Sequence, residues 1–194
     1  MNFRLVVVLG TVLAQGYTVA QLRTVEIFVN NQDDSVRLLS ASKPLVSNIF
    51  GKIGVQLTWH KGDIPAGRNA LGIRTAEHAP ATASREALAA SELRGPGMSE
   101  ITIYKDRLQS LLNLHPNVTR VLAAYVLAHE FAHVMQGVPR HSDSGIMKAH
   151  WSDRDFQEMI YHKLVFAPVD LDLIQKGLAT MAAVRSTPAG EQLL

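Results

Sequence analysis

Residues 129–151, with the sequence HEFAHVMQGVPRHSDSGIMKAHW, carry the pattern that decides the fold and the chemistry of this chain. His129 and His133 are four residues apart, so on a helix their side chains lie one turn above each other on the same face. Two imidazoles in this arrangement can bind one zinc ion at a Zn–N distance of about 2.0–2.1 Å. Glu130 points about a quarter turn away, where a carboxylate can accept a proton from a water that the metal activates. The pattern predicts a zinc hydrolase site, and we expect it to act on peptide bonds.

The histidine pair lies in a segment with the spacing of a helix. The hydrophobic stripe has a period of 3.6 residues and comprises Val118, Leu122, Tyr125, Val126, His129 and His133. It predicts a helix from Asn117 to about Gln136. A third histidine, His141, follows a break at Gly137-Val-Pro139. A helix, a turn and a third ligand can surround a tetrahedral metal and leave its fourth position open for water.

Two other residues are alternatives for the third ligand. Asp143 could bind instead, because a carboxylate oxygen is an acceptable zinc ligand. Glu158, on a later predicted helix, would give a site of two histidines and one glutamate. We favour His141, because the turn leads directly to it. A further alternative is an ordinary amphipathic helix with two partly buried histidines and a surface glutamate.

The same residues resemble the metzincin metallopeptidases, most of all the matrix metalloprotease and archaemetzincin-like branches. HEFAH is followed by a glycine turn, a third histidine and then HSDSGIM. The resemblance implies that His129, His133 and His141 bind zinc, that Glu130 is the general base, and that Met147 is the methionine of the turn beneath the metal. It also implies a single α+β domain: a small, mixed, twisted sheet with a crossover helix and an active-site helix, followed by a helical C-terminal subdomain.

The spacing departs from the usual metzincin motif, in which the glycine comes three residues after the second histidine and the third histidine six residues after it. Here Gly137 comes four residues after His133, and His141 comes eight residues after it. This longer connection assigns the chain to no particular family of the group. The prediction is therefore a metzincin-like zinc metallopeptidase of a bacterial type.

The composition limits the other classes of function. The 194 residues suffice for one domain with its own core, and the formal net charge of +2 provides no basic patch for nucleic acid. The sequence contains no cysteine, which excludes disulfides and thiolate zinc ligands. We expect a monomer with one catalytic zinc ion and a peptide or protein substrate.

The beginning of the chain has the pattern of a secretory signal. A positive charge precedes an apolar run from Leu5 to Leu13, and small residues allow cleavage after Ala14 or Ala20. The run is too short to span a membrane. A buried first strand is the alternative. We expect a signal peptide at 1–20, a catalytic domain at 21–194, and a secreted or periplasmic location.

The remaining elements follow from periodicity and turn residues. The sequence predicts strands at 23–30, 55–59, 71–75 and 100–104, and helices at 35–52, 82–93, 152–166 and after Pro168. The first strand, helix and second strand indicate a right-handed crossover onto a parallel sheet, and Ser152 with Asp155 indicates a helix cap. The resemblance implies that strand 100–104 is the exposed edge that binds extended substrate; the alternative is an ordinary strand within the sheet.

Two other functions fit the pattern. A zinc-stabilised binding domain without catalysis would leave Glu130 without a role. A zinc hydrolase of a non-peptide amide would use the same residues. Tyr161 and His150 are candidates for the group that stabilises the oxyanion in either hydrolase.

Overall fold

The computed structural model describes residues 23–30, 35–85, 87–95, 98–114 and 118–186, so the expected signal peptide at 1–20 lies outside the described residues. Within these ranges the chain forms a mixed sheet of five strands and five helices, in the order β1 (Arg23–Val29), α1 (Ser35–Gly51), β2 (Val55–Lys61), β3 (Leu71–Ala76), β4 (Ala89–Gly95), β5 (Met98–Tyr104), α2 (Lys105–Leu114), α3 (Thr119–Gln136), α4 (Asp153–Ile160) and α5 (Pro168–Ser186). None of the helices in the described part combines the length and the apolar character that crossing a membrane requires.

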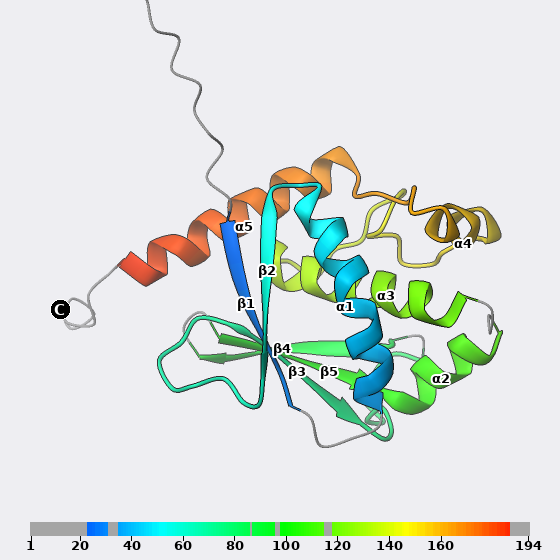
Figure 1. Ribbon diagram of the computed structural model, residues 1–194, viewed down its shortest axis with the longest axis horizontal. Coiled ribbons are helices and arrows are strands. Elements are labelled where there is room, and N and C mark those ends of the chain that lie inside the picture. The colour runs from blue at the N-terminus through cyan, green and yellow to red at the C-terminus, as the bar shows by residue number, and fades with distance from the viewer. Residues whose placement is uncertain (1–22, 31–34, 86, 96–97, 115–117, 187–194) are drawn as a thin grey trace, which may run out of the picture.

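The sheet has the strand order β2-β1-β3-β5-β4 (Figure 1). β1 lies parallel to β2 and to β3, β3 lies parallel to β5, and β4 runs antiparallel to β5. The helix α1 connects the parallel pair β1 and β2, as the crossover pattern predicts. The predicted mixed sheet is therefore confirmed.

The hydrophobic core lies on one face of the sheet, and the opposite face of β1 carries the polar Glu26 and the buried Phe28. Along β1, the side chains of Val25, Ile27 and Val29 alternate into the core, because successive residues of a strand point to opposite faces. The helices α1 and α3 pack against each other on this side (Figure 1). On the opposite side Glu26 accepts a hydrogen bond from Arg68 at 2.6 Å. The alternation that predicts the strand thus holds for Val25, Ile27 and Val29, while Phe28 is buried on the opposite face.

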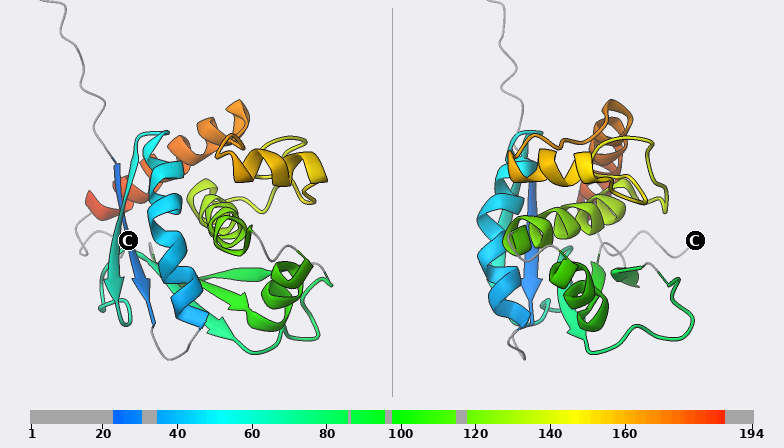
Figure 2. Two further views of the ribbon diagram at one scale, coloured as in Figure 1. Left: turned by 45° about the vertical axis from the view of Figure 1, so that its right-hand side comes forward. Right: turned by 90° about the vertical axis from the view of Figure 1, so that its right-hand side faces the viewer.

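The helix α3 lies in the middle of the molecule. In both views of Figure 2 it lies between α4 and α5 on one side and the β3–β5 part of the sheet on the other. α5 approaches α3 so closely that a Cβ at Gly177 would lie 1.8 Å from the carbonyl oxygen of Met135. Aromatic rings complete the packing, with Phe131 of α3 at 6.1 Å from Phe50 and 5.8 Å from Trp59 between ring centroids. Both faces of α3 are thus held by packing.

The structure corrects the prediction of a helix at 82–93. Residues 89–95 form β4, whose Ala89 pairs with Ile103 and whose Leu93 pairs with Ser99 of β5. Alanine favours a helix by only a few tenths of a kcal/mol over most other residues. A ladder of backbone hydrogen bonds to an existing strand outweighs this preference.

The structure decides between the two predictions for strand 100–104, an exposed edge or an ordinary strand within the sheet, in favour of the second. β5 is paired on both sides, with β3 and with β4, so it is an interior strand. Within the described residues β4 pairs with β5 alone, and it forms the edge of the sheet. Two further differences are α2, which no sequence pattern predicted, and α4, which ends at Ile160 rather than Phe166 because His162 takes a left-handed conformation with φ 55°.

Candidate metal centre

The helix α3 positions two of the three predicted ligands. It ends at Gln136, where Gly137 adopts φ 68° and donates its N–H to the carbonyl oxygens of His133 and Val134. This left-handed cap is the usual role of glycine after a helix. It turns the chain back, so that the loop carrying His141 returns toward the face with the two histidines.

The imidazoles of His129, His133 and His141 converge. The Nε2 atom of His133 lies 3.0 Å from Nε2 of His129 and 3.3 Å from Nε2 of His141. One ligand atom from each of the three histidines lies within 4.8 Å of the others. Tetrahedral coordination with Zn–N bonds of 2.0–2.1 Å places the nitrogens about 3.3 Å apart. The separations recorded for the His133 nitrogen therefore suit a shared zinc ion.

The protonation states also suit a metal. His129 donates from Nδ1 to the carbonyl oxygen of Ile146 at 2.8 Å, so its Nε2 lone pair faces the other histidines. Burial lowers the pKa of His129 to about 4, against the opposing effect of that hydrogen bond. Burial, and then the neighbouring His141, lower the pKa of His133 below its usual value. Neutral imidazoles are the form that binds zinc, so the lowered pKa values of His129 and His133 suit this ion.

Glu130 lies beside the three histidines. It is half-buried and lines the same cleft as they do. Burial raises the pKa of its carboxyl group to about 7. A carboxyl group with a pKa near neutrality is suited to both accepting and releasing a proton.

The turn that follows His141 supports His129, because it contains Ile146, whose carbonyl oxygen accepts the hydrogen bond from His129. Ser142 donates its N–H to the carbonyl oxygen of Met147 at 2.8 Å, and Ile146 donates to the carbonyl oxygen of Val165 at 3.0 Å. Gly145 has φ +76°, and a Cβ there would lie 2.3 Å from the oxygen of Val165. Only glycine fits this turn without strain. Met147 is fully buried at its end.

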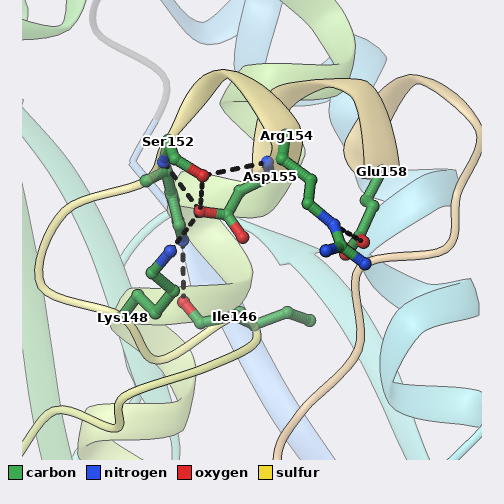
Figure 3. Close-up of polar contacts among 7 residues, drawn as sticks. Ile146, Lys148, Ser152, Arg154, Asp155 and Glu158 are labelled. Atoms are coloured by element: carbon green, nitrogen blue, oxygen red, sulfur yellow. Dashed lines mark hydrogen bonds and ion pairs between the residues drawn. The ribbon is translucent and has the colours of Figure 1, made fainter.

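The segment after this turn is held by α4 (Figure 3). Lys148 forms an ion pair with Asp155, and Ser152 and Asp155 form the predicted capping box. Burial alone would raise the pKa of Asp155, but the hydrogen bonds from Lys148 and Ser152 hold it below its usual value. Trp151 donates from Nε1 to the Ile146 carbonyl oxygen at 3.3 Å. The Ile146 carbonyl that orients His129 is thus itself fixed.

The centre opens into a cleft of about 680 Å³. One wall comes from α3 and the loop that carries His141, a second from the segment around Trp151, and a third from the edge strand β4. This third wall includes Ala89, Ala90, Ser91 and Glu92 of β4. The cleft is large enough for a small ligand or for part of a chain.

The structure brings together the residues that the sequence favoured and leaves out the alternatives. The metal-ligand group found among the described residues includes neither Asp143 nor Glu158, and Glu158 accepts a hydrogen bond from Arg154 at 3.2 Å (Figure 3). His150 lines the cleft. Tyr161 is 66% exposed and is not among the cleft residues.

Some residues around the centre had no role in the sequence prediction. The role of the Ile146 carbonyl oxygen could not be predicted from the sequence, because any residue supplies a backbone oxygen. Asp170 accepts hydrogen bonds from the ligand loop, although it lies 29 residues after His141 in the sequence. The edge strand β4 had one available signal, Pro96-Gly97 between two short segments, which is typical of a turn between strands.

The chain is similar to a solved structure of an archaemetzincin. In a crystal structure of archaemetzincin from Methanopyrus kandleri, the similarity covers 84% of this chain and 99% of that chain, with a TM-score of 0.49 and 16% sequence identity. No protein-family model and no curated protein sequence matches the chain. The class is therefore defined by the fold and the site: a mixed α/β protein with a three-histidine centre compatible with zinc.

Proposed function

We propose that the chain is a secreted or periplasmic zinc metalloendopeptidase, monomeric, with one zinc ion held by His129, His133 and His141. The observation that carries this proposal is the convergence of the three imidazoles with a half-buried carboxylate, Glu130, in one cleft. A purely structural zinc site is closed by four protein ligands and needs no carboxylate beside it. Three ligands and an adjacent base favour a hydrolase.

In the proposed hydrolysis of a peptide bond, Glu130 acts first as the general base and then as the general acid. A zinc ion held by His129, His133 and His141 would supply Lewis-acid chemistry, which would polarise the scissile carbonyl and make a nearby water more acidic. The Glu130 carboxylate accepts a proton from this water as the water oxygen attacks the carbonyl carbon. Glu130 then donates that proton to the amide nitrogen as the C–N bond breaks. The products are a carboxylic acid and an amine, and Glu130 returns to its starting state.

The edge strand β4 supports an extended peptide as the substrate. Ala89, Ala90 and Ser91 border the cleft with small side chains, which let another backbone come close. An unpaired strand edge binds extended peptides through backbone hydrogen bonds. We therefore propose for β4 the substrate contact that the metzincin resemblance implies for strand 100–104.

The test combines zinc content with cleavage of a broad peptide library. The wild type should contain one zinc ion per chain and cleave peptides. Glu130→Gln should keep the zinc and lose about 10²–10⁴-fold in kcat, as expected on removing a general base. Glu158→Gln is the matched control: it makes the same chemical change at a carboxylate that is not in the histidine group, and it should retain both properties.

Three results would contradict parts of this proposal. A wild type without zinc would refute the metal site. Zinc in the wild type and in Glu130→Gln, with no cleavage by either, would favour a zinc-stabilised binding domain. Loss of zinc in Glu158→Gln would make Glu158 the third ligand in place of His141.

A further inference from the structure

The third histidine is held less directly than the other two. His129 and His133 are fixed by one helix, whereas His141 is exposed and lies in the loop between α3 and α4. A histidine on a loop binds a metal well only if the loop already has the required conformation. The contacts of the residues on either side of His141 therefore decide how well the site is formed.

Both neighbours of His141 bind the same buried carboxylate. Ser142 donates from Oγ to Oδ1 of Asp170 at 2.6 Å, and Arg140 donates from Nη1 to the same oxygen at 3.2 Å. Asp170 is fully buried in α5, and Ser142 is buried with it. A buried carboxylate is tolerated only when such donors replace water. The loop is thus held by hydrogen bonds on both sides of His141.

Asp170 is in turn attached to the helix that carries the other two ligands. Gln136, the last residue of α3, donates from Nε2 to Oδ1 of Asp170 at 3.5 Å. The other oxygen, Oδ2, accepts the backbone N–H of Ala167 at 3.2 Å, near the start of α5. The close approach of Gly177 to α3 fixes the distance between the two helices. One side chain therefore connects α3, the loop with His141 and α5.

We propose that Asp170 is a positioning residue of the metal centre, which holds His141 in place through Arg140 and Ser142. This inference rests on the proposed zinc site. Asp170 is not part of the metal-ligand group, so it supports the metal through the loop with His141, and its charge also acts on His133. Losing such a supporting contact commonly weakens metal binding by about 10–100-fold.

The test measures the zinc dissociation constant by competition with a chromophoric chelator. The variants are Asp170→Asn, which changes the carboxylate to an amide, and Ser142→Ala, which removes one hydrogen bond and leaves Asp170 in place. The matched control is Ser42→Ala, because Ser42 is also fully buried and donates to the carbonyl oxygens of Leu38 and Arg120. Ser42 is not among the residues that line the cleft.

We expect zinc to bind about tenfold or more weakly to Ser142→Ala and Asp170→Asn, and with unchanged affinity to Ser42→Ala. The visible absorption of bound cobalt(II) gives a second readout, because its intensity reports tetrahedral coordination, which general destabilisation of a folded protein does not change. Ser142→Ala and Asp170→Asn should both show weaker absorption than the wild type when saturated with cobalt.

Equal zinc affinity and equal cobalt spectra in the wild type, Ser142→Ala and Asp170→Asn would overturn the inference while leaving the zinc site intact. If Asp170→Asn does not fold, Ser142→Ala decides the question. Equal weakening by Ser42→Ala would attribute the effect to stability and likewise overturn the inference. A wild type that binds no zinc would instead refute the proposed function.

Discussion

Replacing Gly145 by alanine tests whether the turn after the ligand loop has to carry glycine. The residue combines φ +76° with a close approach, since a Cβ would lie 2.3 Å from the Val165 carbonyl oxygen. Gly67 provides a matched control. It has the same φ of +76°, but a Cβ there would meet nothing within 4 Å. The two substitutions share the conformational cost, and only Gly145→Ala adds a steric clash.

The expected losses in the free energy of unfolding follow from two contributions, the left-handed backbone conformation and the steric clash. A left-handed conformation costs an L-residue about 1 kcal/mol or slightly more, so Gly67→Ala should lower Tm by about 2–4 °C in a chain of this length. Placing an extra methyl group against a fixed backbone oxygen costs about 2 kcal/mol further. Gly145→Ala should therefore lose about 3 kcal/mol in its free energy of unfolding and about 6–12 °C in Tm.

Gly145→Ala should also weaken zinc binding. The next residue, Ile146, supplies the carbonyl oxygen that accepts the hydrogen bond from His129. A shift of the turn moves this oxygen, and loss of such a contact weakens metal binding by about tenfold or more. Gly67→Ala should leave the zinc affinity unchanged.

The assays are thermal and urea unfolding followed by circular dichroism, together with chelator competition for zinc. The difference between the two variants isolates the clash with Val165. Equal unfolding midpoints for Gly145→Ala and Gly67→Ala, with equal zinc affinities, would refute the argument that the turn is closed against the neighbouring backbone and orients His129.

Other measurements test the metal, the packing of α5 and the cap of α4. Removing zinc should lower the free energy of unfolding by about 4 kcal/mol relative to protein with free zinc at about 1,000 times its dissociation constant; an unchanged Tm after chelation would contradict the site. Gly177→Ala should cost about 3 kcal/mol, because its Cβ would lie 1.8 Å from a backbone oxygen of α3, whereas Gly51→Ala meets nothing within 4 Å and should change stability by less than about 1 kcal/mol. The lowered folded-state pKa of Asp155 means that its ionised form stabilises the fold fully above its ordinary pKa of 3.8, and that this contribution is lost as the pH falls through the lowered value. Asp155→Asn should therefore lower the urea midpoint at pH 7, and its difference from the wild type should shrink as the pH falls below 3.8; a difference independent of pH would contradict the role of the charge.

The sequence determined the parts of the site that lie within one helix. His129 and His133 share a face of α3 because residues four apart in a helix lie one above the other. Glu130 lies beside them because it directly follows His129 and comes three residues before His133 on the same helix. The capping box of Ser152 and Asp155 is equally local, since both partners lie in the first turn of one helix.

The tertiary structure decided the strand β4 and the contacts that support the ligands. Residues 89–95 have a weak intrinsic preference for a helix, and they form a strand because β5 offers a ladder of hydrogen bonds. Asp170 approaches Ser142 only because α5 packs against α3. Periodicity fixes which residues share a face within a few turns, whereas contacts between distant segments depend on how the whole chain buries its apolar surface and satisfies its buried polar groups.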